Sequence, residues 1–321
     1  MSDQRPRPSS DAIPRSSSDP TPQSSSQPSE PSQPKRPDHA PATVGVLGGG
    51  RMGAGIAHAF LLAGSRVTVV ERDAASADAA LQRISESIRR SVERDPALTE
   101  DEITRRITIG VDLGAFAAVD LAIEAVPEDR ALKDDALART EAAMPEHAIL
   151  ASNTSSISID ELAAGRLRPA RFLGLHFFNP VPASALVEIV RGTVTDAAVV
   201  ETASGWVNAL GKTPIVVSDS PGFASSRLGV MLGLEAIRML EEGVASATDI
   251  DAAMTLGYRH PMGPLRTTDV VGLDVRLGIA EELERTLGER FAPPDLLRRM
   301  VAEGKLGRKS GEGFYAWNEE R

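Results

Sequence analysis

The 321-residue sequence contains no cysteine, which excludes disulfide bonds and thiolate-ligated metal sites. No apolar run approaches the roughly 20 residues that a membrane-spanning helix needs, and the first residues lack the apolar segment of a secretory signal. Acidic residues outnumber basic ones by 45 to 35, and the net charge of -10 argues against a general nucleic-acid-binding surface. We therefore expect a cytoplasmic protein that binds neither nucleic acid nor membrane and holds no metal.

The first 41 residues differ in composition from the rest of the chain. They contain ten prolines and eleven serines, with almost no large apolar side chains. Such a segment cannot bury enough surface to offset the entropy lost on ordering, so residues 1–41 are predicted to form a disordered tail. Its five basic and five acidic residues cancel, so the net charge of -10 belongs to residues 42–321.

A dinucleotide-binding pattern begins directly after this segment. A short apolar strand, a glycine turn, a helix and a second strand are predicted at residues 43–47, 48–53, 54–63 and 66–70. In such a unit Gly48 makes the tight turn, Gly50 lets the backbone approach a pyrophosphate, and Gly53 lets helix and strand pack closely. The free N–H groups at the start of the helix favour an anion.

Glu71 follows the second strand, where an acid accepts hydrogen bonds from a ribose 2′-hydroxyl and repels a 2′-phosphate. This position favours NAD over NADP, and Met52 in the glycine turn is expected beside the cofactor. A glycine turn can also be purely structural, but here strand, helix and acid are all in register.

Strand and helix patterns continue to alternate as far as residue 219. Further strands are expected at residues 121–126, 148–152, 172–178, 186–190 and 214–217, with helices at 131–144 and 157–164. Beyond this point the signals are mostly helical. We predict an α/β protein with a Rossmann-type doubly wound sheet over residues 42–219 and an all-α domain over residues 220–321.

A series of motifs resembles the L-3-hydroxyacyl-CoA dehydrogenases, including the 3-hydroxybutyryl-CoA type. The motifs are Gly48–Gly53, Ser152–Ser156, His176–Pro180, Leu186–Glu188, Ser220–Phe223, His260–Pro264 and Gly311–Tyr315. The resemblance covers residues 43–317. The sequence is similar to the stand-alone form of these enzymes, without an enoyl-CoA hydratase module. It implies an NAD-dependent enzyme of β-oxidation or a related acyl-CoA route, with an acyl-CoA substrate and a homodimer formed through the helical domain.

His176 and Glu188 are the candidate catalytic pair. Oxidation of a secondary alcohol needs a base for the hydroxyl proton, and His176 lies near the end of an otherwise apolar strand. Glu188 is the one acid in a second apolar strand, and a buried carboxylate needs a partner. From the residues alone, a backbone-bonded buried histidine and a structural glutamate–arginine pair stay open. The resemblance makes His176 the base and Glu188 the residue that orients it.

Ser155 follows another predicted strand and could instead belong to an N-cap cluster for the helix near Ile157. The resemblance assigns Ser155 to the C3 oxygen of the substrate and to the cofactor site. It also implies cofactor contacts by Glu128, Lys133, Asn179 and Lys309.

For coenzyme A, the resemblance points to Ser87 and Arg94. They lie in an arginine-rich segment, residues 83–106. Because the protein as a whole is acidic, these local cations could bind a phosphate of coenzyme A. Because acids are interleaved with these arginines, an ordinary solvated helix face is the open alternative.

Ser226 departs from the family pattern. An asparagine that helps to hold the substrate is usual just before Arg227, and serine keeps a hydroxyl but loses the amide's second function. Two other functions therefore stay open: an NAD-dependent dehydrogenase of a free hydroxy or sugar acid, and a non-catalytic NAD- or CoA-binding relative. Retention of His176 and Glu188 argues against loss of catalysis.

Overall fold

The computed structural model describes residues 39–317. Most of the predicted disordered tail therefore lies outside the described residues. Pro41, which was assigned to that tail, is buried, and its carbonyl accepts a hydrogen bond of 2.7 Å from Ser65 Oγ. The boundary after residue 41 stays a prediction.

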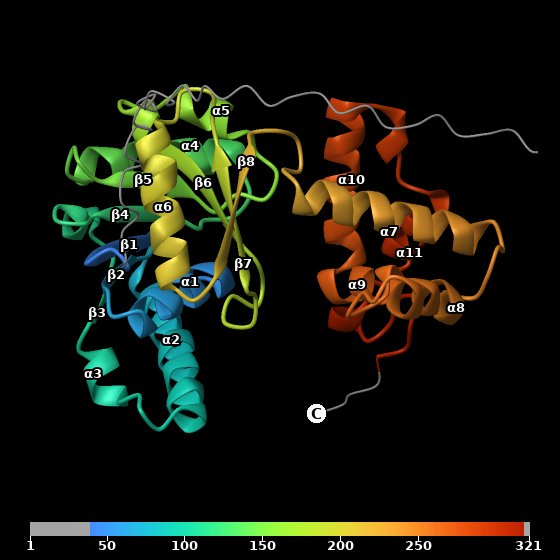
Figure 1. The fold of residues 1–321 in the computed structure, drawn as a ribbon, viewed down its shortest axis with the longest axis horizontal. Helices are drawn as coiled ribbons and strands as arrows, with labels where there is room; N and C mark the ends of the chain where they lie inside the picture. Colours follow the sequence, from blue (N-terminus) through green and yellow to red (C-terminus); the bar gives the residue numbers. More distant parts are fainter. Residues whose placement is uncertain (1–38, 318–321) are drawn as a thin grey trace, which may run out of the picture. The chain divides into compact units, whose positions relative to one another are not determined.

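An eight-stranded sheet carries the first part of the described chain, in the order β3-β2-β1-β4-β5-β6-β7-β8 (Figure 1). The strands are β1 (Thr43–Leu47), β2 (Arg66–Val70), β3 (Ile107–Gly110), β4 (Leu121–Glu124), β5 (Ile149–Ser152), β6 (Phe172–Phe177), β7 (Leu186–Arg191) and β8 (Thr213–Ser218). All neighbours are parallel except β6 and β7, which run antiparallel.

The chain order reverses between β1 and β4, so the connections leave the sheet in opposite directions there. Such a point opens a crevice at the carboxyl ends of the strands, where doubly wound sheets bind dinucleotides. The predicted fold class is confirmed. β3 was not predicted, because its four residues are not deeply buried and lie at the sheet edge without an apolar run.

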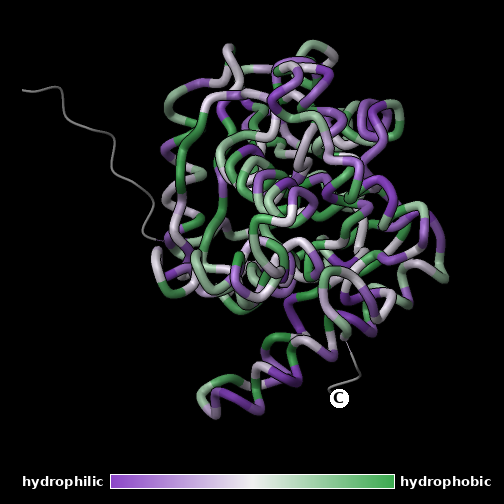
Figure 2. Tube along the Cα trace, turned by 90° about the vertical axis from the view of Figure 1, so that its right-hand side faces the viewer, coloured by the Kyte–Doolittle hydropathy of each residue, from purple (hydrophilic) through white to green (hydrophobic). Residues whose placement is uncertain are grey.

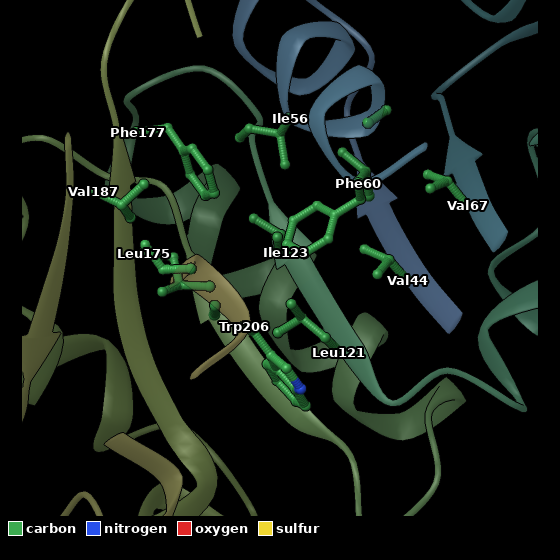
Figure 3. Packing of buried hydrophobic residues seen from close by; sticks show 14 of the residues in the cluster. Val44, Ile56, Phe60, Val67, Leu121, Ile123, Leu175, Phe177, Val187 and Trp206 are labelled. Atoms are coloured by element: carbon green, nitrogen blue, oxygen red, sulfur yellow. The ribbon is translucent and has the colours of Figure 1, made fainter. Parts of the chain in front are cut away.

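Helices cover both faces of the sheet. They are α1 (Arg51–Leu62), α2 (Ala74–Arg94), α3 (Glu100–Thr104), α4 (Arg130–Ala143), α5 (Ile159–Ala163) and α6 (Ala197–Ala209). Side chains of α1, α2 and α6 share one apolar cluster with the strands, and those of α4 and α5 share a second. Figure 3 shows Ile56 and Phe60 of α1, with Trp206 of α6, gathered against the strand residues Leu121 and Ile123.

The helices beyond the last strand have an apolar core of their own. They are α7 (Ser225–Glu241), α8 (Ala247–Ala252), α9 (Pro264–Val271), α10 (Leu273–Leu287) and α11 (Asp295–Ala302). Their shared core includes Val230, Leu234 and Ile237 on one face of α7. The division into domains at residues 219 and 220 stays a prediction, although every strand of the sheet ends before Asp219.

Within residues 39–317, no helix has the length and apolar character needed to cross a membrane. Hydrophilic and hydrophobic residues are mixed along the trace (Figure 2).

Gly53 and Gly50 of the first turn differ in how much room a side chain would have. A β-carbon at Gly53 would lie 1.7 Å from the carbonyl oxygen of Gly48, which is backbone and cannot rotate away. A β-carbon at Gly50 would meet no atom within 4 Å, and the φ of -60° there suits any residue. The close approach of helix and turn therefore leaves no room for a side chain at Gly53, whereas Gly50 has open space beside the turn.

We expect Gly53→Ala to lower the free energy of unfolding by about 3 kcal/mol or more, because the backbone of the turn must shift. Gly50→Ala is the matched control and should change it by no more than about 1 kcal/mol. Urea unfolding of both variants measures this difference. Equal stability of the two variants would contradict the close packing of α1 on the turn.

Candidate active site

A histidine and a glutamate face each other across two antiparallel strands. His176 on β6 is directly paired in register with Glu188 on β7, and His176 Nδ1 lies 2.7 Å from Glu188 Oε2. The glutamate is fully buried and the histidine is 6% exposed. Because two residues directly opposite in adjacent strands point to the same face, the register itself places the two side chains together.

Glu188 also receives hydrogen bonds from the start of α7. The backbone N–H groups of Ala224 and Ser225 donate to Oε1 at 3.1 and 2.8 Å, and Ser225 Oγ donates to Oε2 at 2.6 Å. Burial is the largest influence on this carboxyl and opposes ionisation, yet the hydrogen bonds from His176 and Ser225 outweigh it and lower the pKa of Glu188. The carboxylate thus stays charged and serves as an anion at the helix N-terminus.

Two aromatic rings hold the imidazole between them. The ring of Phe178 lies 4.5 Å from that of His176, and the ring of Phe223 lies 5.8 Å away, measured between centroids. Phe223 has a φ of 50°, in the left-handed region that is unfavourable for a side chain of this size, and Gly222 before it has a φ of 72°. This turn directs Phe223 at the histidine and the next two N–H groups at Glu188.

The loop that carries Ser155 is organised by Glu128. Glu128 Oε1 accepts from Thr154 Oγ1 at 2.6 Å and from the backbone N–H of Ser155 at 2.8 Å. The Ser155 hydroxyl makes only a long contact of 3.3 Å with the same oxygen. Burial opposes ionisation of Glu128, but nearby Lys133 and the loop's donors together lower its pKa. A stable carboxylate therefore fixes the loop backbone and leaves the Ser155 hydroxyl weakly held.

Lys133 completes this network from α4. It is 1% exposed, and its ammonium lies 2.7 Å from Glu124 Oε1 and 3.2 Å from Glu128 Oε2. The structure therefore shows Lys133 and Glu128, both expected near the cofactor, as an internal ion pair that supports the Ser155 loop.

Asn153 ties the Ser155 loop to the strand that carries His176. Its Oδ1 accepts from the backbone N–H of Phe177 at 2.9 Å. The N-cap of α5 is Ser158, whose side chain accepts from the N–H of Glu161, while Thr154 Oγ1 accepts from the N–H of Ile157 at 2.9 Å just before that helix. Asn179 is exposed just beyond the end of β6.

A cavity of about 930 Å³ lies where the strand order reverses. Gly48, Gly50, Met52 and Glu71 line it, as expected for the cofactor positions of the first turn. The N-cap of α1 is Gly50, which provides no side-chain cap, and the first turn of α1 holds no acid, so its N–H groups face the open space beside Gly50. This cradle fits a dinucleotide pyrophosphate.

Glu71, directly after β2, is one of the residues that line this cavity. Its Oε1 accepts a hydrogen bond of 2.7 Å from the N–H of Gly49, which holds the carboxylate against the glycine turn. Arg83, expected in the coenzyme A segment, instead lines the same cavity, with Nη1 3.4 Å from the Gly49 carbonyl.

The structure does not bring all predicted site residues to the histidine. Lys309 forms an ion pair with Asp274 at 2.5 Å in the helical part. Ser87 donates to the Arg83 carbonyl within α2, and Arg94 is exposed in the last turn of that helix.

Two of the arginines in the segment of residues 83–106 have the contacts of an ordinary solvated helix face, the alternative that the sequence left open. Arg89 and Arg90 both pair with Glu86 on the same helix, at 2.7 and 2.9 Å. Exposed pairs of this kind occupy the guanidinium groups with neighbouring acids rather than with a ligand.

Ser225 is the site residue that sequence reasoning missed. The sequence pattern pointed to Ser226, whereas the hydroxyl that donates to Glu188 belongs to Ser225. No hydrogen bond of the Ser226 side chain occurs among residues 39–317, and Ser226 is half-buried at the start of α7. The only available signal was the adjacency of two serines after Gly222, which does not say which hydroxyl turns toward the sheet.

A doubly wound sheet with a cavity at its switch point and a buried histidine–glutamate pair near the same strand ends is typical of nicotinamide-dependent dehydrogenases. The chain matches the family model of the 3-hydroxyacyl-CoA dehydrogenase NAD binding domain over residues 43–220 and that of the C-terminal domain over residues 222–317. The chain belongs to the 3-hydroxyacyl-CoA dehydrogenase family.

Individual relatives agree with this assignment. The 3-hydroxybutyryl-CoA dehydrogenase of Mycobacterium tuberculosis is 45% identical over 280 residues, covering 85% of this chain and 98% of that protein. The human mitochondrial hydroxyacyl-coenzyme A dehydrogenase is 39% identical over 284 residues, covering 85% and 90%. The crystal structure of (S)-3-hydroxybutyryl-CoA dehydrogenase from Ralstonia eutropha has a TM-score of 0.83 at 39% identity, covering 87% of this chain and 100% of that one.

We expect Ser225→Ala to reduce the free energy of unfolding at pH 7 by about 1.5–3 kcal/mol, because a hydrogen bond to a buried carboxylate is lost. The pKa of Glu188 is lowered in the folded protein from the ordinary value of 4.5, so its ionised form stabilises the fold above that pH. This contribution disappears as the pH falls through the lowered pKa.

The difference in free energy of unfolding between wild type and Ser225→Ala should therefore become smaller below about pH 4.5. Denaturant unfolding at a series of pH values measures it, with Ser226→Ala as the matched control. A difference that stays constant with pH would mean that the hydroxyl does not act through the ionised glutamate.

Proposed function

We propose that this chain interconverts an L-3-hydroxyacyl-CoA and NAD⁺ with a 3-oxoacyl-CoA, NADH and a proton. The buried His176–Glu188 pair carries the proposal, because it supplies an oriented base at the carboxyl edge of the sheet that also holds the dinucleotide cavity. Membership of the family supplies the class of substrate and the cofactor.

NAD binding is assigned to the first turn and the strand after it. Gly48, Gly50 and Met52 line the cavity and are proposed to contact the pyrophosphate, and Glu71, which also lines it, is proposed to accept a ribose hydroxyl. When bound, NAD supplies the hydride acceptor. The carboxylate of Glu71 repels a 2′-phosphate, so NAD is preferred over NADP. Further contacts are proposed for Asn179 beyond β6, and for Glu128, Lys133, Ser155 and Lys309.

His176 acts as the general base in this proposal. Nδ1–H donates a hydrogen bond to the Glu188 carboxylate, which leaves the lone pair of Nε2 to accept the C3 hydroxyl proton of the substrate. The carboxylate stabilises the imidazolium that then forms, and the rings of Phe178 and Phe223 limit rotation of the imidazole. In the reverse direction the imidazolium returns the proton to the C3 oxygen.

Ser155 is assigned to the C3 oxygen of the substrate. Its backbone is held by Glu128, while its hydroxyl, at 3.3 Å from that carboxylate, is free to turn to a stronger acceptor. Ser226 is proposed as a weaker replacement for the family's asparagine. Ser87 and Arg94 are proposed to contact coenzyme A from α2.

We also propose a homodimer through the helical domain. On α7, Leu228 is 71% exposed on the side opposite the buried stripe, and Leu256 and Tyr258 beyond α8 are 82% and 76% exposed. Apolar side chains this exposed are typical of a surface that another copy covers.

Reduction of acetoacetyl-CoA, compared with that of free acetoacetate, tests the proposed reaction. NADH oxidation should be rapid with the thioester and at background level with the free acid, because the family's binding energy comes from coenzyme A. NADPH in place of NADH should give a much lower rate. Equal turnover of the free acid would favour a dehydrogenase of hydroxy acids, and no turnover of either would favour a non-catalytic binder.

We expect His176→Gln to lower kcat at least 100-fold while NADH affinity changes only a few-fold, because a general base contributes about 10²–10⁴-fold to the rate. Steady-state kinetics and fluorescence titration with NADH measure the two effects. His147→Gln is the matched control, since the His147 side chain is 71% exposed. A His176→Gln enzyme that keeps most of its activity would remove this residue from the mechanism.

A further inference from the structure

Ser225, the first residue of α7, binds both oxygens of the Glu188 carboxylate. Its backbone N–H donates to Oε1 at 2.8 Å and its hydroxyl donates to Oε2 at 2.6 Å. Any residue except proline would supply the backbone N–H at this position. The hydroxyl is therefore the part of this contact that depends on the residue type.

The Ser225 hydroxyl and the imidazole of His176 share one oxygen of Glu188. His176 Nδ1 lies 2.7 Å from Oε2, the atom that also accepts from the hydroxyl, whereas the two backbone N–H groups at the start of α7 donate to Oε1. A single atom thus connects the side chain of Ser225 to the histidine.

This shared oxygen couples the hydroxyl to the protonation of the imidazole. When His176 is neutral, the pair with Glu188 carries a single negative charge, and when His176 is an imidazolium the pair is neutral overall. A hydroxyl donates more strongly to the charged arrangement, because hydrogen bonds to an ion are roughly twice as strong as neutral ones. The Ser225 hydroxyl therefore stabilises the neutral imidazole more than the imidazolium.

The other side chains in contact with the pair are apolar. In the described part of the chain, no ionisable side chain except its partner forms a hydrogen bond or ion pair with His176 or Glu188. Ile215 on β8 is paired directly with Glu188, and the rings of Phe178 and Phe223 flank the imidazole. A low local dielectric of this kind strengthens the effect of a single hydrogen bond.

The charged residues of the surrounding elements have contacts of their own. On α7, Nη1 of Arg227 lies 3.4 Å from Ser220 Oγ. Asp219, directly after β8, accepts from Ser158 Oγ at 2.6 Å. Glu128, beyond the end of β4, is paired with the ammonium of α4. The side-chain donor that acts directly on the pair is the hydroxyl of Ser225.

We propose that Ser225 is a positioning residue for the general base: its hydroxyl fixes the oxygen of Glu188 that binds His176 and keeps the imidazole neutral at lower pH than Glu188 alone would allow. This inference rests on the proposed function. Glu188 shows the same influence of the hydroxyl, because burial raises its pKa while the hydrogen bonds from His176 and Ser225 lower it below the usual value. The hydroxyl thus extends proton acceptance from the substrate to less alkaline conditions.

Oxidation of L-3-hydroxybutyryl-CoA by NAD⁺, measured over a range of pH, tests this role. We expect kcat/KM to rise with pH to a plateau, with a midpoint about 0.5–1 pH unit higher in Ser225→Ala than in the wild type. At the plateau kcat should fall by about 3–10-fold with little change in KM, because the imidazole is less firmly oriented. Equal midpoints in the two proteins would overturn the proposal.

Two further variants separate this role from a purely structural one. Ser225→Thr keeps a hydroxyl at the same position and should keep the wild-type midpoint. Ser204→Ala is the matched control, because it removes a buried hydroxyl that donates to the Val200 carbonyl within α6, and it should leave both midpoint and rate unchanged. A midpoint that moved as far in either of these variants as in Ser225→Ala would contradict the proposal.

An NMR titration of the imidazole makes the test independent of turnover. The His176 signals, identified by their absence from His176→Gln, should titrate about 0.5–1 pH unit higher in Ser225→Ala than in the wild type, without substrate or cofactor. Catalytic activity with unshifted signals would refute this inference alone. Shifted signals without turnover of any 3-hydroxyacyl-CoA would support the effect of Ser225 on the imidazole and refute the proposed function.

Discussion

The buried carboxylate of Glu188 is the interaction on which the rest of the site depends. A charge with no exposure to water is tolerable only when its oxygens are fully hydrogen-bonded, and this one accepts from an imidazole, two backbone N–H groups and a hydroxyl. Those donors come from β6 and from the start of α7. The same carboxylate that binds His176 therefore also fixes where the helical part of the chain begins.

Buried acids organise the second half of the site in the same manner. Glu124 and Glu128 share the ammonium of Lys133, and Glu128 gathers the loop that carries Ser155. Both carboxylates lie at or beyond the end of β4, so the carboxyl edge of the sheet is stiffened by charge pairs rather than by apolar packing. A preorganised polar edge of this kind holds catalytic groups without reorganisation during turnover.

Local patterns in the sequence were sufficient for the glycine turn and for most strands, because each of these rests on residue type and on periodicity within a few positions of the chain. His176 and Glu188 were only candidates on that basis, and the family resemblance was needed to choose them. β3 escaped prediction because a short edge strand buries little and carries no apolar run. The ion pairs of Lys133 could not be predicted, because a buried ammonium is recognisable only when both of its carboxylate partners, Glu124 and Glu128, are in place.

The sequence by itself determined the fold class and the cofactor turn, because these follow from short motifs and strand periodicity, and through its resemblance to a family it predicted His176 and Glu188 as the catalytic pair. Only the tertiary structure decided that Ser225 rather than Ser226 reaches Glu188. This outcome depends on how the start of α7 meets the sheet. Contacts between elements far apart in the chain leave no mark in the local pattern of residues.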